Sequence, residues 1–169
     1  MSKAESHPVI DQVRAAFPDH VTAHKVFAGE PFISVSREGL REVCTFLKED
    51  PGLDFDYPVD VTAVDYPDDA ERFEVIHVLW SVQHRRRVVL KTRVSEADCE
   101  VDSVADIWRG MSFMERETYD MYGVRFAGHP DLRRIMMTDD FDGWPLRKDF
   151  PIEGKGWREN YDFIPQLGD

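Results

Sequence analysis

Residues 59–94 read VDVTAVDYPDDAERFEVIHVLWSVQHRRRVVLKTRV, and this stretch decides the fold. It contains three strand-like segments, at about residues 59–66, 72–82 and 87–94, separated by turns rich in Pro, Asp, His and Arg. The middle segment is apolar on both faces. In the last segment two alternating sets face opposite ways: Val88, Leu90 and Val94 on one side, and Arg87, Lys91 and Arg93 on the other. This alternation predicts a sheet with one face toward the core and one toward water.

The residues before this stretch predict a helix, two strands and a second helix. Ser6 and Pro8 are typical of a helix start, and apolar residues recur at helical spacing until Pro18. Apolar runs on both sides of Gly29-Glu30-Pro31 predict a hairpin. Ser36 is expected to cap the second helix, whose apolar stripe contains Leu40, Val43, Cys44 and Leu47. The order helix, two strands, helix, three strands predicts a two-layer α+β domain with a mixed sheet.

Two short helices are expected after an acidic loop that follows the third strand-like segment. Ser103 with Asp106 forms one capping-box pattern, and Ser112 with Glu115 forms another. The second helix is expected to run from about Phe113 to Tyr122. Gly123 is expected to end it in the left-handed conformation.

The last 45 residues, 125–169, show no periodicity, and they hold four of the ten prolines, five of the ten glycines and seven aromatic residues. A linker would lack large apolar groups, whereas exposed aromatic residues in this number need a surface to cover them. We therefore divide the chain into an α+β domain at 1–124, expected to fold alone, and an extended partner-binding arm at 125–169.

Composition excludes several classes of function. Lys and Arg number 21 against 33 Asp and Glu, so the net charge of -12 argues against nucleic acid as a partner. The longest stretch without a charged residue, Val75–His84, has ten residues, whereas a membrane span takes about 20. No secretory signal precedes residue 8, which favours a cytosolic site of action. Cys44 and Cys99 are too few and too far apart for a disulfide framework or cluster ligation.

Four residues form the best candidate for a catalytic or metal site: Glu115, Glu117, Asp120 and His129. Their spacing favours a structural role, because the Glu-x-x-His pattern of carboxylate metal sites is absent. Arg116 and Asp120 are four residues apart and are expected to pair on one helical face. We therefore prefer an ion-pair network to a free-standing carboxylate hydrolase or metal enzyme.

The run Glu115-Arg116-Glu117-Thr118-Tyr119-Asp120-Met121-Tyr122-Gly123, with His129 and Arg133-Arg134-Ile135-Met136, resembles the signature of the 30 kDa subunit of respiratory complex I. Residues 143–151, GWPLRKDFP, resemble the second hallmark of that family. The strong resemblance covers about residues 103–151. Phe113 departs from the family pattern, which has Trp there, but it keeps an aromatic residue.

The resemblance implies a non-catalytic structural protein, known in bacteria as the C subunit, in the peripheral arm of the proton-pumping NADH-quinone oxidoreductase. Its partner would be the quinone-site (D, 49 kDa) subunit, on the cytoplasmic side of the bacterial inner membrane. The resemblance implies no cofactor in this chain, with FMN, iron-sulfur clusters and quinone in neighbouring subunits. Homologous subunits of membrane-bound hydrogenases and of ferredoxin-driven or deazaflavin-driven dehydrogenases remain alternatives.

The residues expected at the partner interface or in structural ion pairs all lie on the two hallmark runs or between them. They are Glu115, Arg116, Glu117, Asp120, His129, Arg133, Arg134, Trp144, Arg147, Lys148 and Asp149.

Overall fold

The computed structural model describes residues 7–154 and confirms the expected order of elements. The first half contains α1 (Pro8–Ala16), β1 (Val21–Phe27), β2 (Glu30–Val35), a 3-10 turn (Arg37–Gly39) and α2 (Leu40–Glu49). The second half contains β3 (Tyr57–Asp65), β4 (Phe73–Ser81), β5 (Arg86–Val94), β6 (Glu100–Asp102), α3 (Met111–Tyr122) and β7 (Arg125–Ala127). The fold is therefore α+β.

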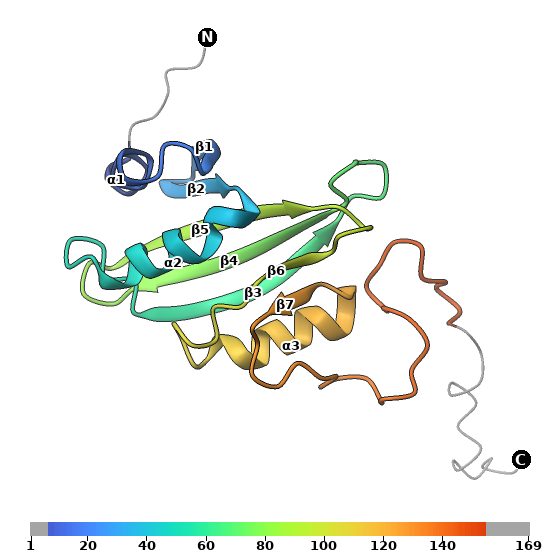
Figure 1. The fold of residues 1–169 in the computed structure, drawn as a ribbon. Coiled ribbons are helices and arrows are strands. Elements are labelled where there is room, and N and C mark those ends of the chain that lie inside the picture. The colour runs from blue at the N-terminus through green and yellow to red at the C-terminus, as the bar shows by residue number, and fades with distance from the viewer. Residues whose placement is uncertain (1–6, 155–169) are drawn as a thin grey trace, which may run out of the picture.

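The main sheet has five strands in the order β1-β2-β5-β4-β3. It is mixed, as expected, because β2 and β5 run parallel while the other neighbours are antiparallel. Figure 1 shows α2 over one face of this sheet, with α3 and the β6–β7 pair near the edge formed by β3.

The core lies between the helices and one face of the sheet. Val88, Leu90 and Val94 of β5 are buried there, whereas Arg87, Lys91 and Arg93 lie on the opposite face, which confirms the predicted alternation. The apolar stripe of α2 is fully buried, including Cys44. Burial also raises the pKa of the Cys44 thiol, so this cysteine is a core residue rather than a reactive one.

Both capping-box predictions in the segment 103–115 are wrong, although the second helix forms close to its predicted bounds. Residues 103–110 form turns instead of a short helix, and Ser103 Oγ donates to Glu115 Oε2 over 2.6 Å. Helix α3 begins at Met111, and Ser112 Oγ lies 3.1 Å from His129 Nε2 rather than capping the helix. In each case a tertiary contact satisfies the serine hydroxyl. The end of α3 is as predicted, with Gly123 at φ 77°.

The segment expected to form the arm begins with a strand. β7 pairs in parallel with β6, and Phe126 on β7 is only 2% exposed. Residues 128–154, called the arm segment below, contain turns but no helix or strand and run past α3 (Figure 1). Trp157, Tyr161 and Phe163 lie outside the described residues.

Candidate functional site: the junction between helix α3 and the arm segment

Asp120 is the centre of the junction between α3 and the arm segment. Its side chain is completely buried, and Oδ2 accepts hydrogen bonds from the backbone N–H groups of Ile135, Met136 and Met137 at 2.9, 2.7 and 2.8 Å. Burial alone would raise the pKa of Asp120, but these bonds and the Arg134 guanidinium hold it below its usual range. Asp120 is therefore a carboxylate around which the backbone of residues 135–137 is folded.

Arg134 ties the same carboxylate to the following part of the arm segment. Its Nη1 donates to Asp120 Oδ1 over 2.7 Å, and its Nη2 donates to the carbonyl oxygens of Phe141 and Gly143 at 3.1 and 3.0 Å. The guanidinium also stacks over the Trp144 ring, 4.6 Å from the ring centroid. One side chain thus joins α3 to residues 141–144.

Trp144 packs against the end of α3. Its ring meets Tyr119 edge to face, with 5.2 Å between the centroids. A Cβ atom added to Gly123 would come within 2.6 Å of Trp144 Cε2 and 2.8 Å of Arg147 Nη2. Gly123 is therefore required twice, for its positive φ and for the close approach of the indole.

Arg147 connects the arm segment to both α3 and the main sheet. Its Nε donates to the Tyr122 carbonyl oxygen over 2.6 Å, and its Nη1 lies 3.1 Å from Glu96 Oε1. The guanidinium also covers the Phe73 ring of β4, with 4.7 Å to the centroid. Only 15% of the Arg147 side chain is exposed, which places these bonds in a shielded environment.

A buried ion pair on the β3–β4 hairpin binds Lys148 and Asp149 of the second hallmark run. Arg72 donates to both oxygens of Asp65 at 2.8 and 2.9 Å, and it also contacts Asp149 Oδ2 at 3.1 Å. The Lys148 backbone N–H donates to Asp65 Oδ2 over 2.7 Å. The Arg72 hydrogen bond holds the pKa of Asp65 below its usual range.

Sequence reasoning missed Asp65, Arg72 and Glu96. The hairpin pattern could have revealed the first two, because Asp65 pairs in register with Phe73, which places Asp65 beside Arg72. No spacing rule links Glu96 to Arg147, since these residues are 51 positions apart. Through Asp65, Arg72 and Glu96, the contacts of the arm segment form a network that extends to the main sheet.

The expected pair between Arg116 and Asp120 is wrong. Arg116 instead donates to the backbone carbonyl oxygens of Arg133 and Arg134, each over 3.2 Å. Arg133 pairs with Asp131 at the surface, with 2.9 Å between Nε and Oδ2. Asp120 takes Arg134 as its partner because the arm segment brings that side chain to the buried carboxylate.

The four candidate catalytic residues do not converge on one site. Asp120 is occupied by the arm segment, and Glu117 is exposed. Glu115 and His129 are buried together, with 4.0 Å between Oε2 and Nε2, but Glu115 accepts hydrogen bonds from Ser103 Oγ and Val104 N–H. Within residues 7–154, no three His, Cys, Asp or Glu residues are arranged to hold a metal ion. The contacts of Glu115 and Asp120 instead join separate segments of the chain to α3.

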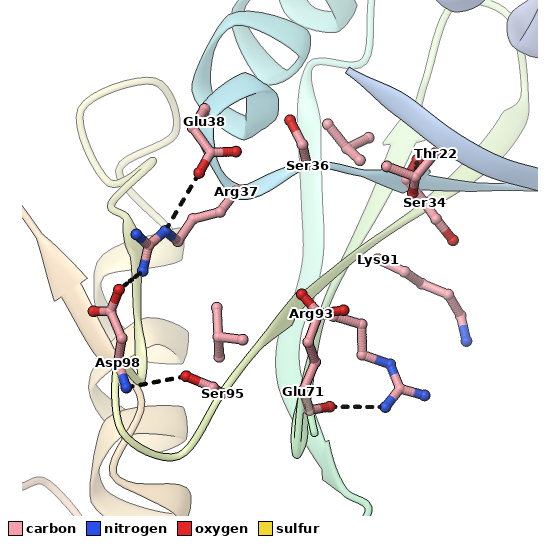
Figure 2. A pocket seen from close by; sticks show the side chains of 12 residues that line it. Thr22, Ser34, Ser36, Arg37, Glu38, Glu71, Lys91, Arg93, Ser95 and Asp98 are labelled. Carbon is pink, nitrogen blue, oxygen red and sulfur yellow. Dashed lines mark hydrogen bonds and ion pairs between the residues drawn. The ribbon is translucent and has the colours of Figure 1, made fainter. Parts of the chain in front are cut away.

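A separate cavity of about 420 Å³ lies at the ends of β2 and β5 on the open face of the sheet (Figure 2). Lys91 and Arg93 reach into it, and both pair with Glu74, at 2.6 and 3.2 Å. Arg37 on its rim contacts Glu38 and Asp98 (Figure 2). Since each of these cations already has a carboxylate partner, the cavity is not organised around an anion.

The chain matches one family model and several bacterial relatives along most of its length. The model of the family described as respiratory-chain NADH dehydrogenase, 30 Kd subunit, matches residues 33–156. The C subunit of NADH-quinone oxidoreductase from Geobacter metallireducens is 45% identical over 159 residues, covering 94% of this chain and 96% of the relative. The protein of the same name from Geobacter sulfurreducens is 43% identical with the same coverage.

Solved structures share the fold. A trypsin-resistant fragment (1-134) of Nqo5 matches with a TM-score of 0.63 and 30% identity, covering 73% of this chain and 96% of that chain. A chain of the membrane-bound sulfane sulfur reductase, an archaeal respiratory membrane complex, matches with a TM-score of 0.74 over 95% of this chain and 94% of that chain. Its identity is 23%, so this likeness shows the fold alone. The family match and the high identity along nearly the whole chain show that this protein belongs to the 30 kDa subunit family of respiratory-chain NADH dehydrogenase, the family of the C subunit of NADH-quinone oxidoreductase, or complex I.

Proposed function

We propose that this chain is a non-catalytic structural subunit in the peripheral arm of the proton-pumping NADH-quinone oxidoreductase. Its role is to hold the quinone-site (D, 49 kDa) subunit in place while electrons pass to quinone. The observation that carries this proposal is the two-sided construction of the arm segment. One side is fastened to the domain by buried charges, while the other exposes large apolar side chains.

The fastened side keeps the arm segment in one conformation before any partner binds. The Asp120–Arg134 and Asp65–Arg72 pairs are both largely buried, and Arg147 adds bonds to α3. A preformed binding segment loses less conformational entropy on association than a flexible one does. The charged residues of the two hallmark runs therefore favour partner binding by fixing the conformation of the arm segment.

The outward side supplies the contact surface. Ile135, Met136, Leu146 and Ile152 are 39%, 65%, 49% and 103% exposed, and Phe113 on α3 is 63% exposed. Large apolar side chains gathered on one segment are typical of surfaces that another protein covers. Phe113 belongs to α3, and Ile135 and Met136 belong to the first part of the arm segment.

Cofactors and location follow from the same proposal. FMN, the iron-sulfur clusters and quinone belong to neighbouring subunits, and this chain serves as a scaffold that carries no redox group. We place it on the cytoplasmic side of the bacterial inner membrane, attached through its partners. None of the helices within residues 7–154 is long and apolar enough to cross a membrane.

The second candidate is a homologous subunit of a membrane-bound hydrogenase or of a ferredoxin-driven or deazaflavin-driven dehydrogenase. A chain of the sulfane sulfur reductase, an archaeal respiratory membrane complex, has the same fold, so the fold by itself does not separate the two candidates. The relatives at 43% and 45% identity favour the NADH-quinone enzyme.

A deletion strain of the source bacterium tests the proposal. Membranes without this chain should lose electron transfer from NADH to quinone but keep NADH oxidation by a soluble artificial acceptor, because the flavin site lies in other subunits. The wild-type gene should restore quinone reduction. Loss of both activities together with normal levels of the other subunits would contradict a purely structural role. Unchanged NADH-quinone activity, with loss of hydrogen- or ferredoxin-dependent activity, would select the second candidate.

A further inference from the structure

Glu115 and His129 form a buried pair that is separate from the Asp120, Arg134 and Arg147 contacts of the arm segment. Both side chains are completely shielded from solvent, and their nearest charged atoms lie 4.0 Å apart. The pair joins three segments of the chain. Glu115 belongs to α3 and binds residues 103 and 104, and His129 belongs to the first turn of the arm segment.

The hydrogen bonds of His129 define its neutral form. The Asp131 backbone N–H donates to Nδ1 over 3.0 Å, so Nδ1 acts as an acceptor and the ring proton lies on Nε2. That nitrogen faces the Ser112 carbonyl oxygen at 3.1 Å. The ring therefore presents an N–H group, rather than an acceptor, toward Ser112 and Glu115.

Both protonation states of Glu115 have hydrogen-bond partners, but only the neutral acid avoids a buried charge. Oε1 accepts from the Val104 N–H over 2.7 Å, and Oε2 lies 2.6 Å from Ser103 Oγ. The serine hydroxyl can donate to a carboxylate or accept from a carboxylic acid. Among the described residues, no lysine or arginine forms an ion pair with Glu115, so the carboxylate has no full positive charge beside it.

The other ionisable groups around Glu115 do not replace this missing charge. Arg41 of α2 is turned to Asp106 and to the Ser103 carbonyl oxygen, and Asp106 itself disfavours ionisation of Glu115. Cys44 of α2 is buried, and its pKa is raised. Burial is the main reason that the pKa of Glu115 is raised to about 7, against the smaller opposing effects of the bonds from Ser103 and Val104 and of the Arg41 charge.

We propose that Glu115 is the proton-binding residue of a pH-sensitive joint between α3, residues 103–105 and residues 128–131. This joint stabilises the fold more when Glu115 is a neutral acid than when it is a buried carboxylate without a cation beside it. Since the pKa of Glu115 is higher in the folded chain than in the unfolded chain, its contribution to stability is fully present below the ordinary glutamate pKa. It is lost as the pH rises through the pKa of about 7 in the folded chain. The folded chain therefore loses this stabilising contribution as the pH rises toward neutrality.

The first test uses Glu115→Gln in the full chain, because glutamine keeps the shape and both hydrogen bonds of the neutral acid. Glu117→Gln, on the exposed side of the same helix, is the matched control. Between pH 5 and pH 7 the unfolding constant of the wild type should rise relative to Glu115→Gln by at most about tenfold per pH unit, the limit for one bound proton. The control should follow the wild type. An equal pH dependence in all three proteins would overturn the proposal.

The second test observes the carboxyl group directly, by NMR of the full chain with 13C-labelled glutamate. One glutamate signal should titrate near pH 7, should disappear in Glu115→Gln and should remain in Glu117→Gln. Ser103→Ala keeps Glu115 but removes a bond that favours its ionised form, so this variant should titrate at higher pH than the wild type. If every glutamate titrated below pH 5, or if Ser103→Ala lowered the midpoint, the joint would not exist.

Discussion

Asp120 and Arg134 are 14 residues apart, and Arg134 Nη1 donates to Asp120 Oδ1 over 2.7 Å. Together they organise the arm segment, because the other oxygen of Asp120 binds residues 135–137 and the other nitrogen of Arg134 binds residues 141 and 143. The conformation of residues 134–143 thus depends on this buried pair rather than on secondary structure.

Asp120→Ala should therefore release the arm segment. The substitution leaves three backbone N–H groups and a guanidinium without their acceptor, and breaking a buried pair costs about 3–5 kcal/mol. We expect rapid proteolytic cleavage within residues 130–145 and a lower unfolding temperature. Asp131→Ala is the control, because its pair with Arg133 is exposed, and it should leave both measurements nearly unchanged. Equal cleavage of the two variants would count against the anchoring role of Asp120.

Gly123→Ala should displace Trp144 from the end of α3. The new methyl group would meet the indole at 2.6 Å, and a non-glycine residue with positive φ costs about 1–2 kcal/mol in addition. Gly128→Ala is a matched control, since Gly128 has φ 78° but nothing within 4 Å of an added Cβ. Both variants should lose stability, but only Gly123→Ala should change the arm contacts. Tryptophan fluorescence and proteolysis of the two variants check this difference.

Local patterns in the sequence were sufficient for most of the fold. Apolar periodicity predicted α1, α2 and the five strands of the main sheet, and Gly123 marked the end of α3. The Ser103–Asp106 capping pattern failed because Ser103 bonds to Glu115 instead. A capping box is a local signal, and a buried carboxylate from elsewhere in the chain can take its place.

The contacts of the candidate site were harder to predict. The two hallmark runs drew attention to Asp120, Arg134 and Arg147, but they did not indicate which residues these side chains contact. The arm segment has no periodicity, so its path past α3 follows from tertiary bonds that single-sequence patterns do not contain. Arg116 illustrates this limit. Helical spacing predicted that it pairs with Asp120, whereas in the structure it donates to backbone carbonyl oxygens of the arm segment.

Acid should weaken the attachment of residues 148 and 149 to the sheet. The pKa of Asp65 is lowered by its bond with Arg72. The contribution of Asp65 to folding stability is therefore fully present above the ordinary aspartate pKa, and it is lost as the pH falls through the lowered pKa. Asp65→Asn should therefore be clearly less stable than the wild type at pH 7, by about 3–5 kcal/mol, with a smaller difference in strong acid. Chemical unfolding at several pH values measures this difference.

The position of the domain boundary gives a further prediction. A chain that ends at Val124 loses β7 and Phe126, which is part of the core, so it should be strongly destabilised, by about 3–5 kcal/mol for the aromatic side chain alone. A chain that ends at Gly128 keeps both and should be the more stable fragment. We therefore propose that the folding unit extends through Ala127. Equal melting temperatures for the two truncated chains would contradict this boundary.

The measurement that tests the central claim most directly is recovery of the complex from membranes through a tag on the quinone-site subunit. We predict that the double variant Ile135→Asp and Met136→Asp is recovered in less than about a tenth of the wild-type yield, because charges would enter an apolar contact. The variant itself should melt like the wild type, since both side chains are exposed. Phe27→Asp, at the exposed tip of the β1–β2 hairpin, is the control and should be recovered normally. Normal recovery and normal NADH-quinone activity of the double variant would contradict the proposal that the arm segment holds the quinone-site subunit.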